Sequence, residues 1–371
     1  MRTVIPVENG DPLAAVRGFL KRLLEADVLD ALLVPMETPA GAVTPALVAD
    51  PDLVDAANPL APVMGLNAAR VAGYVSVREP RGRIGVVLRP CELRALVELV
   101  KLQQASLENL VTIGVDCLGT YDVSVYSTMQ ADGGLDMDAL LATAQSGELS
   151  PQEGALQKGY AFRDACQMCE KPHVERADIT FELFGADLTT GIPVSLPDEL
   201  AEKLGLAAAE GDGRRGGVVA ARAQVRDARF AEIRQRIEEE GVEGVFAACV
   251  RCHNCMTVCP ICYCKTCLFK SPVFDHEPMQ YVNWARRKGA YRLPADTMLF
   301  HLTRLNHMVL SCIGCGMCTS DCPADLPVGL VFRAIGQQVQ EVFEYVPGRN
   351  VDEPLPLVTF REDEWMEVGE E

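Results

Sequence analysis

The chain has 371 residues, of which 49% are hydrophobic and 23% charged, so it can bury sizeable cores and lacks the composition of a disordered protein. Its 52 acidic and 34 basic side chains give a formal net charge of −18 at pH 7. This balance argues against nucleic acid as a partner, because phosphate binding needs clustered Lys and Arg. The 15 cysteines are more than packing requires and are bunched, so metal ligation is the first interpretation to test.

The sequence shows neither a secretory signal nor a membrane span. The N-terminus has no basic flank followed by a long apolar run, and no stretch approaches about 18 uninterrupted apolar residues. We therefore expect a soluble, cytoplasmic protein, in which disulfides are rare and bonds between thiolates and metals persist.

The N-terminal part predicts alternating helices and strands. Apolar residues at helical spacing predict a helix over residues 11–26. Apolar runs predict buried strands at 32–35, 71–77, 84–88 and 110–115, and the sequence Glu79-Pro-Arg-Gly predicts a turn. A helix over residues 91–104 completes a βαβ unit with the last two strands. The first 200 residues therefore predict an α/β fold.

A Gly-rich, polar passage that begins at Glu210 predicts a domain boundary. We expect an α/β domain at 1–210, an α+β ferredoxin-like iron–sulfur domain at 211–350, and an acidic tail at 351–371. The second domain contains helices predicted over 229–240, 297–310 and 328–346. The tail is either a contact for a partner or a solvated terminus.

Two cysteine runs in the second domain have the same spacing. Cys249-x2-Cys252-x2-Cys255-x3-Cys259-Pro260 is repeated as Cys312-x2-Cys315-x2-Cys318-x3-Cys322-Pro323. In bacterial two-cluster ferredoxins with this spacing, the fourth cysteine of each run ligates the other cluster. We therefore predict one [4Fe–4S] cluster on Cys249, Cys252, Cys255 and Cys322, and a second on Cys312, Cys315, Cys318 and Cys259. Zinc is the competing metal, but its usual paired ligands do not follow this pattern twice.

The seven other cysteines form two groups. Cys262, Cys264 and Cys267 are either ligands of a further metal centre, with His276, His301 or His307 as a fourth ligand, or protected thiols. Cys91 follows a predicted strand, Cys117 follows the next one, and Cys166 and Cys169 form a CxxC pair. Strand ends in a parallel sheet meet at one edge, so these four could ligate a third [4Fe–4S] cluster. The alternative is a redox-active pair with two buried thiols.

Three segments resemble the β-subunit family of coenzyme F420-reducing hydrogenases and F420-linked formate dehydrogenases. They are Gly85-Val-Val-Leu-Arg-Pro-Cys-Glu-Leu-Arg-Ala-Leu, Ile113-Gly-Val-Asp-Cys-Leu-Gly, and Cys166-Gln-Met-Cys-Glu followed by Ala177-Asp-Ile-Thr. The resemblance covers roughly residues 13–185, and a ferredoxin module is a common appendage in this family. It implies an FAD-binding flavin domain at 1–210, with Cys91, Cys117, Cys166 and Cys169 as ligands of a flavin-proximal cluster.

A flavin takes two electrons as hydride and can pass them on singly, which suits an electron-transferring subunit of an oxidoreductase complex. The family implies a formate dehydrogenase, hydrogenase or heterodisulfide reductase-like partner. No Gly-x-Gly-x-x-Gly fingerprint is present, so other loops must hold FAD. The candidates are Asn58, Asn67, Arg89 and Thr120, with turn-capping and ion-pair roles as alternatives.

Three other functions stay open from the sequence. The chain could be a flavin-free iron–sulfur relay, a stand-alone FAD and iron–sulfur reductase, or a structural zinc protein. No acid–base or nucleophilic constellation is evident, and none is needed for electron transfer.

Overall fold

The structure is a computed structural model, and it describes residues 1–77, 82–146, 159–209 and 217–360. The turn predicted at 79–82, the boundary expected at 210/211 and the end of the acidic tail fall wholly or partly outside these residues.

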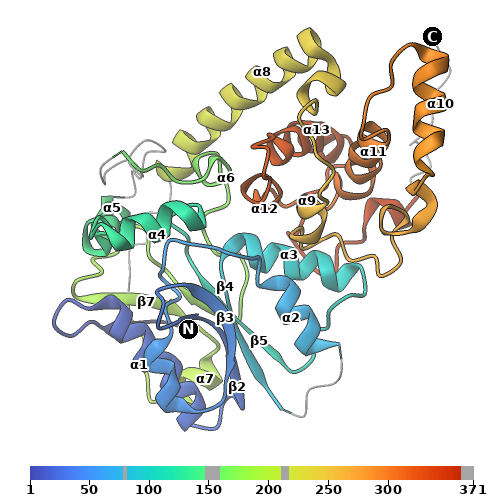
Figure 1. Cartoon of the computed structure of the whole chain (residues 1–371). Helices are drawn as coiled ribbons and strands as arrows, with labels where there is room; N and C mark the ends of the chain where they lie inside the picture. Colours follow the sequence, from blue (N-terminus) through green and yellow to red (C-terminus); the bar gives the residue numbers. More distant parts are fainter. Residues whose placement is uncertain (78–81, 147–158, 210–216, 361–371) are drawn as a thin grey trace.

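The strands of the described residues form one sheet at the N-terminal side of the molecule (Figure 1). They are β1 (Arg2–Pro6), β2 (Ala31–Glu37), β3 (Val43–Val48), β4 (Ile84–Leu88), β5 (Leu110–Val115), β6 (Ile179–Phe181) and β7 (Gly191–Ser195). Their order is β1-β7-β6-β5-β4-β2-β3. The central strands β2, β4, β5 and β6 are parallel, and the outer pairings are antiparallel. The prediction of an α/β fold is confirmed.

Helices follow the chain in two groups. The N-terminal group is α1 (Pro12–Glu25), η1 (Pro51–Ala56), α2 (Ala69–Ser76), α3 (Pro90–Lys101), α4 (Val123–Ala131), α5 (Met137–Ser146), α6 (Asp164–Gln167) and α7 (Asp198–Lys203). The C-terminal group is α8 (Gly217–Val245), α9 (Asn254–Thr257), η3 (Leu268–Lys270), η4 (Pro272–Phe274), α10 (Pro278–Lys288), α11 (Thr297–Met308), α12 (Met317–Ser320), α13 (Val328–Val342) and η5 (Pro356–Val358). Asp11 caps α1 by accepting the Ala14 amide at 2.9 Å.

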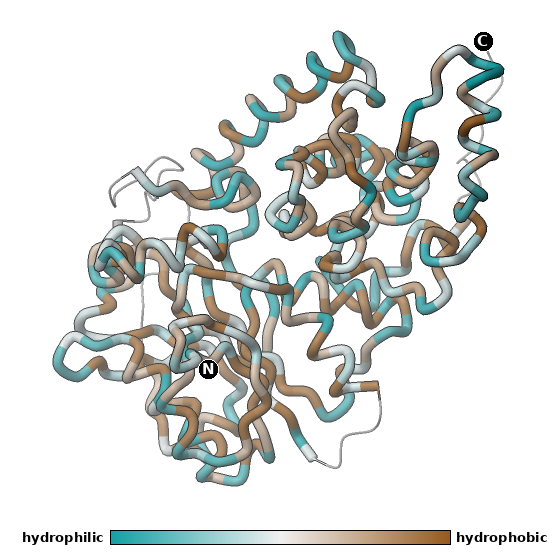
Figure 2. Tube along the Cα trace, in the orientation of Figure 1, coloured by the Kyte–Doolittle hydropathy of each residue, from teal (hydrophilic) through white to brown (hydrophobic). Residues whose placement is uncertain are grey.

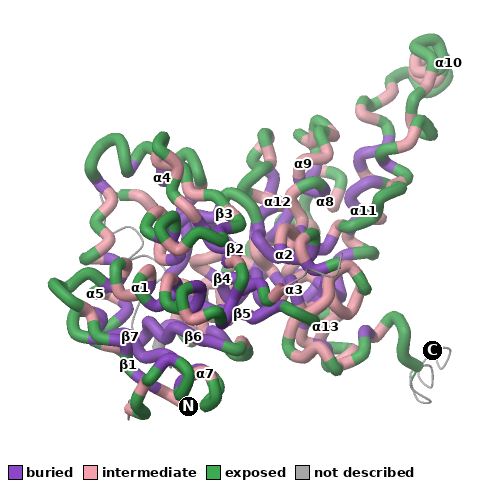
Figure 3. The backbone as a smooth tube through the Cα atoms, turned by 90° about the horizontal axis from the view of Figure 1, so that it is seen from below, coloured by how far each residue is buried: buried purple, intermediate pink, exposed green. Residues whose placement is uncertain are grey.

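The sheet has a hydrophobic core on each face, as the alternation of side chains along a strand requires. Leu32 and Val34 face one core with α1, whereas Leu33 faces the other. This second core continues through α2 and α3 into the C-terminal module, where it includes Phe246 and Phe332. The inner strands β4, β5 and β6 are accordingly buried, as Figure 3 shows, and the sheet is largely apolar in Figure 2. The cysteine-rich module therefore packs on one face of the sheet.

The strand predicted over residues 71–77 is wrong, because this segment is the helix α2. Its buried residues Ala69, Ala72, Gly73 and Ser76 recur at helical spacing, and they are small. A Cβ on Gly73 would lie 3.2 Å from the Gln104 carbonyl oxygen, so the helix lies close to the end of α3. Packing of this small face outweighs the strand preference of Val71, Val75 and Val77.

The other helix predictions are confirmed within a few residues at α1, α3, α11 and α13, whereas the helix predicted over 229–240 is the C-terminal part of the longer α8. In the described part of the chain, no helix is both long enough and apolar enough to cross a membrane.

Candidate functional site

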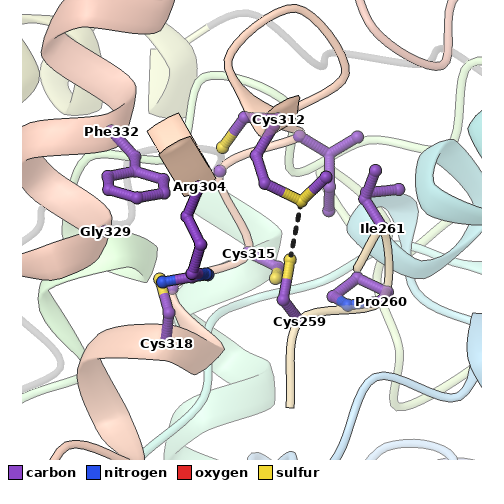
Figure 4. Close-up of a pocket in the computed structure, with 13 residues that line it drawn as sticks. Cys259, Pro260, Ile261, Arg304, Cys312, Cys315, Cys318, Gly329 and Phe332 are labelled. Atoms are coloured by element: carbon purple, nitrogen blue, oxygen red, sulfur yellow. Dashed lines mark hydrogen bonds between the residues drawn. The ribbon is translucent and has the colours of Figure 1, made fainter. Parts of the chain in front are cut away.

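The two ferredoxin-type runs converge on two separate pockets. Cys249, Cys252, Cys255 and Cys322 line one pocket, here called site 1. Cys312, Cys315, Cys318 and Cys259 line the other, here called site 2 and drawn in Figure 4. The fourth cysteine of each run thus lies with the first three of the other run, in the exchanged arrangement that the spacing predicts. In the described residues no three His, Cys, Asp or Glu side chains are arranged to hold a single metal ion.

The two runs share a local backbone pattern that turns their thiols inward. The residues before and after the second cysteine have left-handed φ in both runs: Arg251 at 55° and His253 at 65°, Gly314 and Gly316 at 74° each. A four-residue helix then carries the third cysteine, α9 in one run and α12 in the other. Glycine adopts this conformation without strain, whereas Arg251 and His253 need support. Arg251 pairs with Asp296, and the His253 ring stacks on Phe300 with centroids 4.6 Å apart.

Most thiols of both sites are at least partly buried, whereas Cys252 of site 1 is exposed. Burial raises the pKa of Cys255 to about 11 and that of Cys315 to about 12, and neighbouring thiolates add to both effects. The Arg251 amide donates to Cys249 Sγ at 3.4 Å, which favours the thiolate. Four thiolates can be ionised together here only beside a compensating cation. Bound iron would supply that charge, so the donor set fits iron–sulfur clusters.

Two buried side chains of α11 contact site 1, and the sequence prediction did not assign them there. His301 Nε2 lies 3.3 Å from Cys249 Sγ, and its ring stacks on Phe246 with centroids 3.9 Å apart. Burial lowers the pKa of His301 to about 4, and Arg304 adds to the effect. Arg304 donates to Cys255 Sγ at 3.1 Å and also lines site 2. No spacing rule identifies them, because α11 lies between the two cysteine runs.

The remaining four predicted ligands gather at the carboxyl edge of the parallel strands; they are here called site 3. Cys91 lies in the first turn of α3, just after β4, and Cys117 directly follows the adjacent β5. Burial raises the pKa of Cys117 to about 12, and the nearby Cys166 and Cys169 thiolates add to the effect. Cys117 and Cys169 likewise add to the raised pKa of Cys91. Cys117 is therefore within electrostatic range of the other three thiols of this site.

Three buried arginines surround site 3. Arg163 Nη2 lies 3.7 Å from Cys166 Sγ, and its Nε donates to Thr120 Oγ1 at 2.9 Å. Burial alone would raise the pKa of Cys166, but the Arg163 charge and the Thr120 hydrogen bonds outweigh it and lower the pKa. Arg222 is 1% exposed, and its Nε has no hydrogen-bond partner among the described residues. Arg89 is also buried, and its charge acts on Cys117. Buried cations of this kind need an anion, and a thiolate-ligated cluster fits that need.

Site 3 adjoins site 2 directly. A Cβ on Gly316, next to Cys315, would lie 2.2 Å from Ala165 Cβ, next to Cys166. Arg163 Nη1 also reaches Met317 Sδ at 3.3 Å. Because Arg304 contacts site 1 and lines site 2, the three sites lie in the order 3, 2, 1.

The four residues predicted to hold FAD are all buried and bind the chain itself. Asn58 donates to Glu37, Asn67 accepts the Ala69 amide at 3.1 Å, and Thr120 Oγ1 lies 3.3 Å from Cys166 Sγ. Arg89 Nη2 donates to the carbonyl oxygens of residues 61 and 63, both at 2.8 Å. These contacts agree with the structural roles given above as the alternatives to FAD binding. The assignment of the four residues to FAD therefore stays a prediction.

A further cavity of about 450 Å³ lies between the two halves of the chain; it is lined by Ala165 and Gln167, the sequence neighbours of Cys166, and it shares Gly316 with the lining of site 2. It is lined by polar side chains including Ser124, Arg163, Ser320 and Arg333. No local sequence pattern predicts this cavity, because its walls come from α4, α6, α12 and α13.

The third group of cysteines is only partly buried. Cys262 follows Cys259 of site 2, and its amide donates to the Cys259 carbonyl oxygen at 3.2 Å. Burial raises the pKa of Cys262 to about 11, and the Cys259 thiolate adds to the effect. Cys267 Sγ contacts Met256 Sδ at 3.8 Å, and Cys264 is exposed. Of the histidines considered as a fourth ligand, His276 packs on Tyr281 and Trp284, His301 reaches Cys249, and His307 is exposed.

Two family models match the chain. Residues 81–192 match the C terminus of the coenzyme F420 hydrogenase/dehydrogenase beta subunit, and residues 245–326 match a 4Fe-4S dicluster domain. The first range contains the cysteines of site 3, and the second contains those of sites 1 and 2. The resemblance predicted from the sequence is confirmed.

Two curated relatives are similar over most of their length. The F420-dependent formate dehydrogenase subunit beta of Methanocaldococcus jannaschii is 26% identical over 310 residues, 74% of this chain and 75% of its own. The F420-dependent formate dehydrogenase 1 subunit beta of Methanococcus maripaludis is 25% identical over 395 residues, 94% of each chain. Among solved structures, a chain of the F420-reducing [NiFe] hydrogenase complex from Methanosarcina barkeri is 11% identical, with a TM-score of 0.42, and covers 65% of this chain and 91% of its own.

Proposed function

Because this chain belongs to the coenzyme F420 hydrogenase/dehydrogenase beta-subunit family through residues 81–192 and carries a 4Fe-4S dicluster domain, we propose that it is the electron-transferring subunit of an oxidoreductase complex. Sites 1 and 2 would each hold a [4Fe–4S] cluster, and site 3 would hold a third. Each cluster, once bound, supplies one-electron transfer.

The observation that carries this proposal is the linear order of three four-thiol sites. Ala165 and Gly316 bring the loops of sites 3 and 2 into contact, and Arg304 lies between sites 2 and 1. One-electron carriers work in such a series when neighbouring centres are close. A structural zinc protein does not need this adjacency, nor the exchange of Cys259 and Cys322 between the two runs.

We further propose that FAD binds in the cavity of about 450 Å³ beside site 3. Arg163 and Arg333 would face its phosphates or its reduced ring, and Ser124 and Ser320 would provide hydrogen bonds. A flavin held there would supply the exchange of one hydride, which carries two electrons, and of single electrons with a neighbouring cluster. The flavin-free relay is the second candidate function, because the four FAD candidates of the sequence bind the chain itself.

The names of the relatives support a proposal for the hydride carrier and the partners. Both curated relatives are named as beta subunits of F420-dependent formate dehydrogenases. We propose coenzyme F420 as the carrier, with NAD(P)H as the alternative, and a formate dehydrogenase, hydrogenase or heterodisulfide reductase-like subunit as the partner.

Anaerobic purification of the full chain tests the proposal, with counts of iron, sulfide and flavin and identification of subunits that co-purify. Three clusters give about twelve irons per chain. A colourless preparation with zinc in place of iron would refute the proposal. Twelve irons without a flavin absorbance band would favour the flavin-free relay. Substrate reduction by the isolated chain would favour the stand-alone reductase.

A further inference from the structure

Arg304 is a buried cation placed between two thiol sites. It lies on α11 and is 3% exposed. Its Nη1 donates to Cys255 Sγ at 3.1 Å and its Nη2 to the Cys255 carbonyl oxygen at 3.0 Å, both in site 1. The same side chain lines site 2, and Figure 4 shows its guanidinium beside Cys318. Resting on the function proposed above, we propose that Arg304 is a positioning residue that raises the reduction potentials of both clusters of the dicluster module.

The charge of Arg304 is not neutralised by a carboxylate. Among the described residues it forms no ion pair, and its neighbours are the Phe300 and Phe332 rings, with the guanidinium carbon 5.6 and 5.0 Å from their centroids. Its Nη1 lies 3.1 Å from Cys255 Sγ, and its side chain lines site 2 together with Cys259 and Cys318. The anions that balance this cation are therefore the ligand sulfurs of the two sites.

A fixed cation beside a cluster favours the reduced state, because reduction adds one negative charge. The interaction is strong where water is excluded, since the effective dielectric constant is low. An N–H donor to a ligand sulfur acts in the same direction, because hydrogen bonds to the sulfurs are among the determinants of cluster potential. One side chain thus acts on two neighbouring centres, which keeps both potentials above the values that buried thiolates alone would set.

The shape of the guanidinium matters as well as its charge. The planar group fits between the two rings while separate N–H groups reach the sulfur and the carbonyl of Cys255. Its Nε is buried and has no hydrogen-bond partner among the described residues, so a donor is left for an acceptor in site 2. Lysine would keep the charge but could not make these contacts together.

The test compares anaerobically purified full-length wild type with Arg304→Gln, Arg304→Lys and Arg236→Gln. Arg236 is an exposed arginine of α8 that pairs with Glu240, so its variant makes the same change in net charge away from the sites. Iron content is measured first, and the clusters are then titrated by EPR at controlled potential. These readouts do not depend on activity.

We expect Arg304→Gln to lower the ratio of reduced to oxidised cluster in sites 1 and 2 about tenfold at a fixed potential. For a one-electron couple, this is a fall of about 59 mV in the reduction potential. Arg304→Lys should show about a threefold effect, and both Arg236→Gln and the signal of site 3 should stay at the wild-type potential. If Arg304→Gln lacks iron, Arg304→Lys decides the question.

The inference is overturned if an iron-replete Arg304→Gln or Arg304→Lys protein titrates like wild type, or if Arg236→Gln shifts as far. Such a result with about twelve irons per chain leaves the proposed function intact. Loss of the iron count in the wild type would instead overturn the proposed function.

Discussion

Substitution of Gly316 by alanine tests whether the loops of sites 2 and 3 are in contact. Gly316 has φ 74°, and nothing separates its Cα from Ala165 of α6. A new Cβ would lie 2.2 Å from Ala165 Cβ, a separation that atoms of the two chain segments cannot keep. One segment must therefore move, and the side chains nearest to it are the Cys315 and Cys166 thiols.

The expected cost has two parts. Left-handed φ costs a non-glycine residue about 1–2 kcal/mol. Overpacking against Ala165 adds about 1–3 kcal/mol. Gly10 provides a matched control, because it has φ 70° and a Cβ there would meet nothing within 4 Å. We expect the free energy of unfolding to fall by about 1–2 kcal/mol in Gly10→Ala and by about 2–5 kcal/mol in Gly316→Ala.

Anaerobic urea unfolding, followed by circular dichroism, measures both variants. The double variant Ala165→Gly/Gly316→Ala removes the Ala165 Cβ with which the new Cβ would clash. Its free energy of unfolding should therefore be about 1–3 kcal/mol higher than the sum of the single changes predicts. EPR of the reduced protein should also show a weaker magnetic interaction between sites 2 and 3 in Gly316→Ala. Equal costs for Gly10→Ala and Gly316→Ala would refute the close contact from which the order of the sites is derived.

Three further outcomes are expected. Cys259→Ala should alter the EPR signal of the same cluster as Cys312→Ala, and an effect on the other cluster would contradict the exchanged ligation. Cys166→Ala should lower iron from about twelve to about eight per chain, and an unchanged count would remove site 3 as a cluster site. Glu98 is fully buried beside Lys101 and accepts hydrogen bonds from Tyr345 and Gly348. Glu98→Ala should therefore lower the free energy of unfolding in urea by about 3–5 kcal/mol. A loss below about 1 kcal/mol would contradict this network.

Much of the fold follows from local pattern. The βαβ unit of β4, α3 and β5 agrees with the prediction, and β5 matches its predicted bounds. These elements have strong apolar periodicity, and Pro90 starts α3 at a position where proline is favourable. The helix α2 was mispredicted, because its sequence favours a strand and only its close packing on α3 makes it a helix. The sequence does not predict β1, β3, β6 and β7. The edge strands β1 and β3 are only partly buried, β6 has three residues, and β7 contains Gly191 and Pro193.

The ligands of sites 1 and 2 can be predicted from the sequence, because the geometry of a cysteine run is local. Three cysteines at three-residue spacing can ligate one cluster through local backbone geometry alone. The fourth cysteine of the run ligates the other cluster. The flavin site cannot be predicted from the sequence in the same way. Without a glycine fingerprint, the candidates Asn58, Asn67, Arg89 and Thr120 were chosen from turn-like sequence, and their polar atoms hold the turns themselves.

The sequence by itself determined which cysteines can share a cluster in sites 1 and 2, and that the first half of the chain is an α/β sheet. Tertiary structure decided that sites 3, 2 and 1 lie in a row and which cations reach them. Arg222 of α8 donates to the Leu118 carbonyl oxygen, next to Cys117, and Arg304 of α11 donates to Cys255 Sγ, so both reach cysteines that are distant in sequence. Arg163 contacts the nearby Cys166, but it also reaches Met317 in the loop of site 2. The physical reason is that thiolate ligation depends on short-range spacing, whereas the burial of a charge depends on every element packed around it.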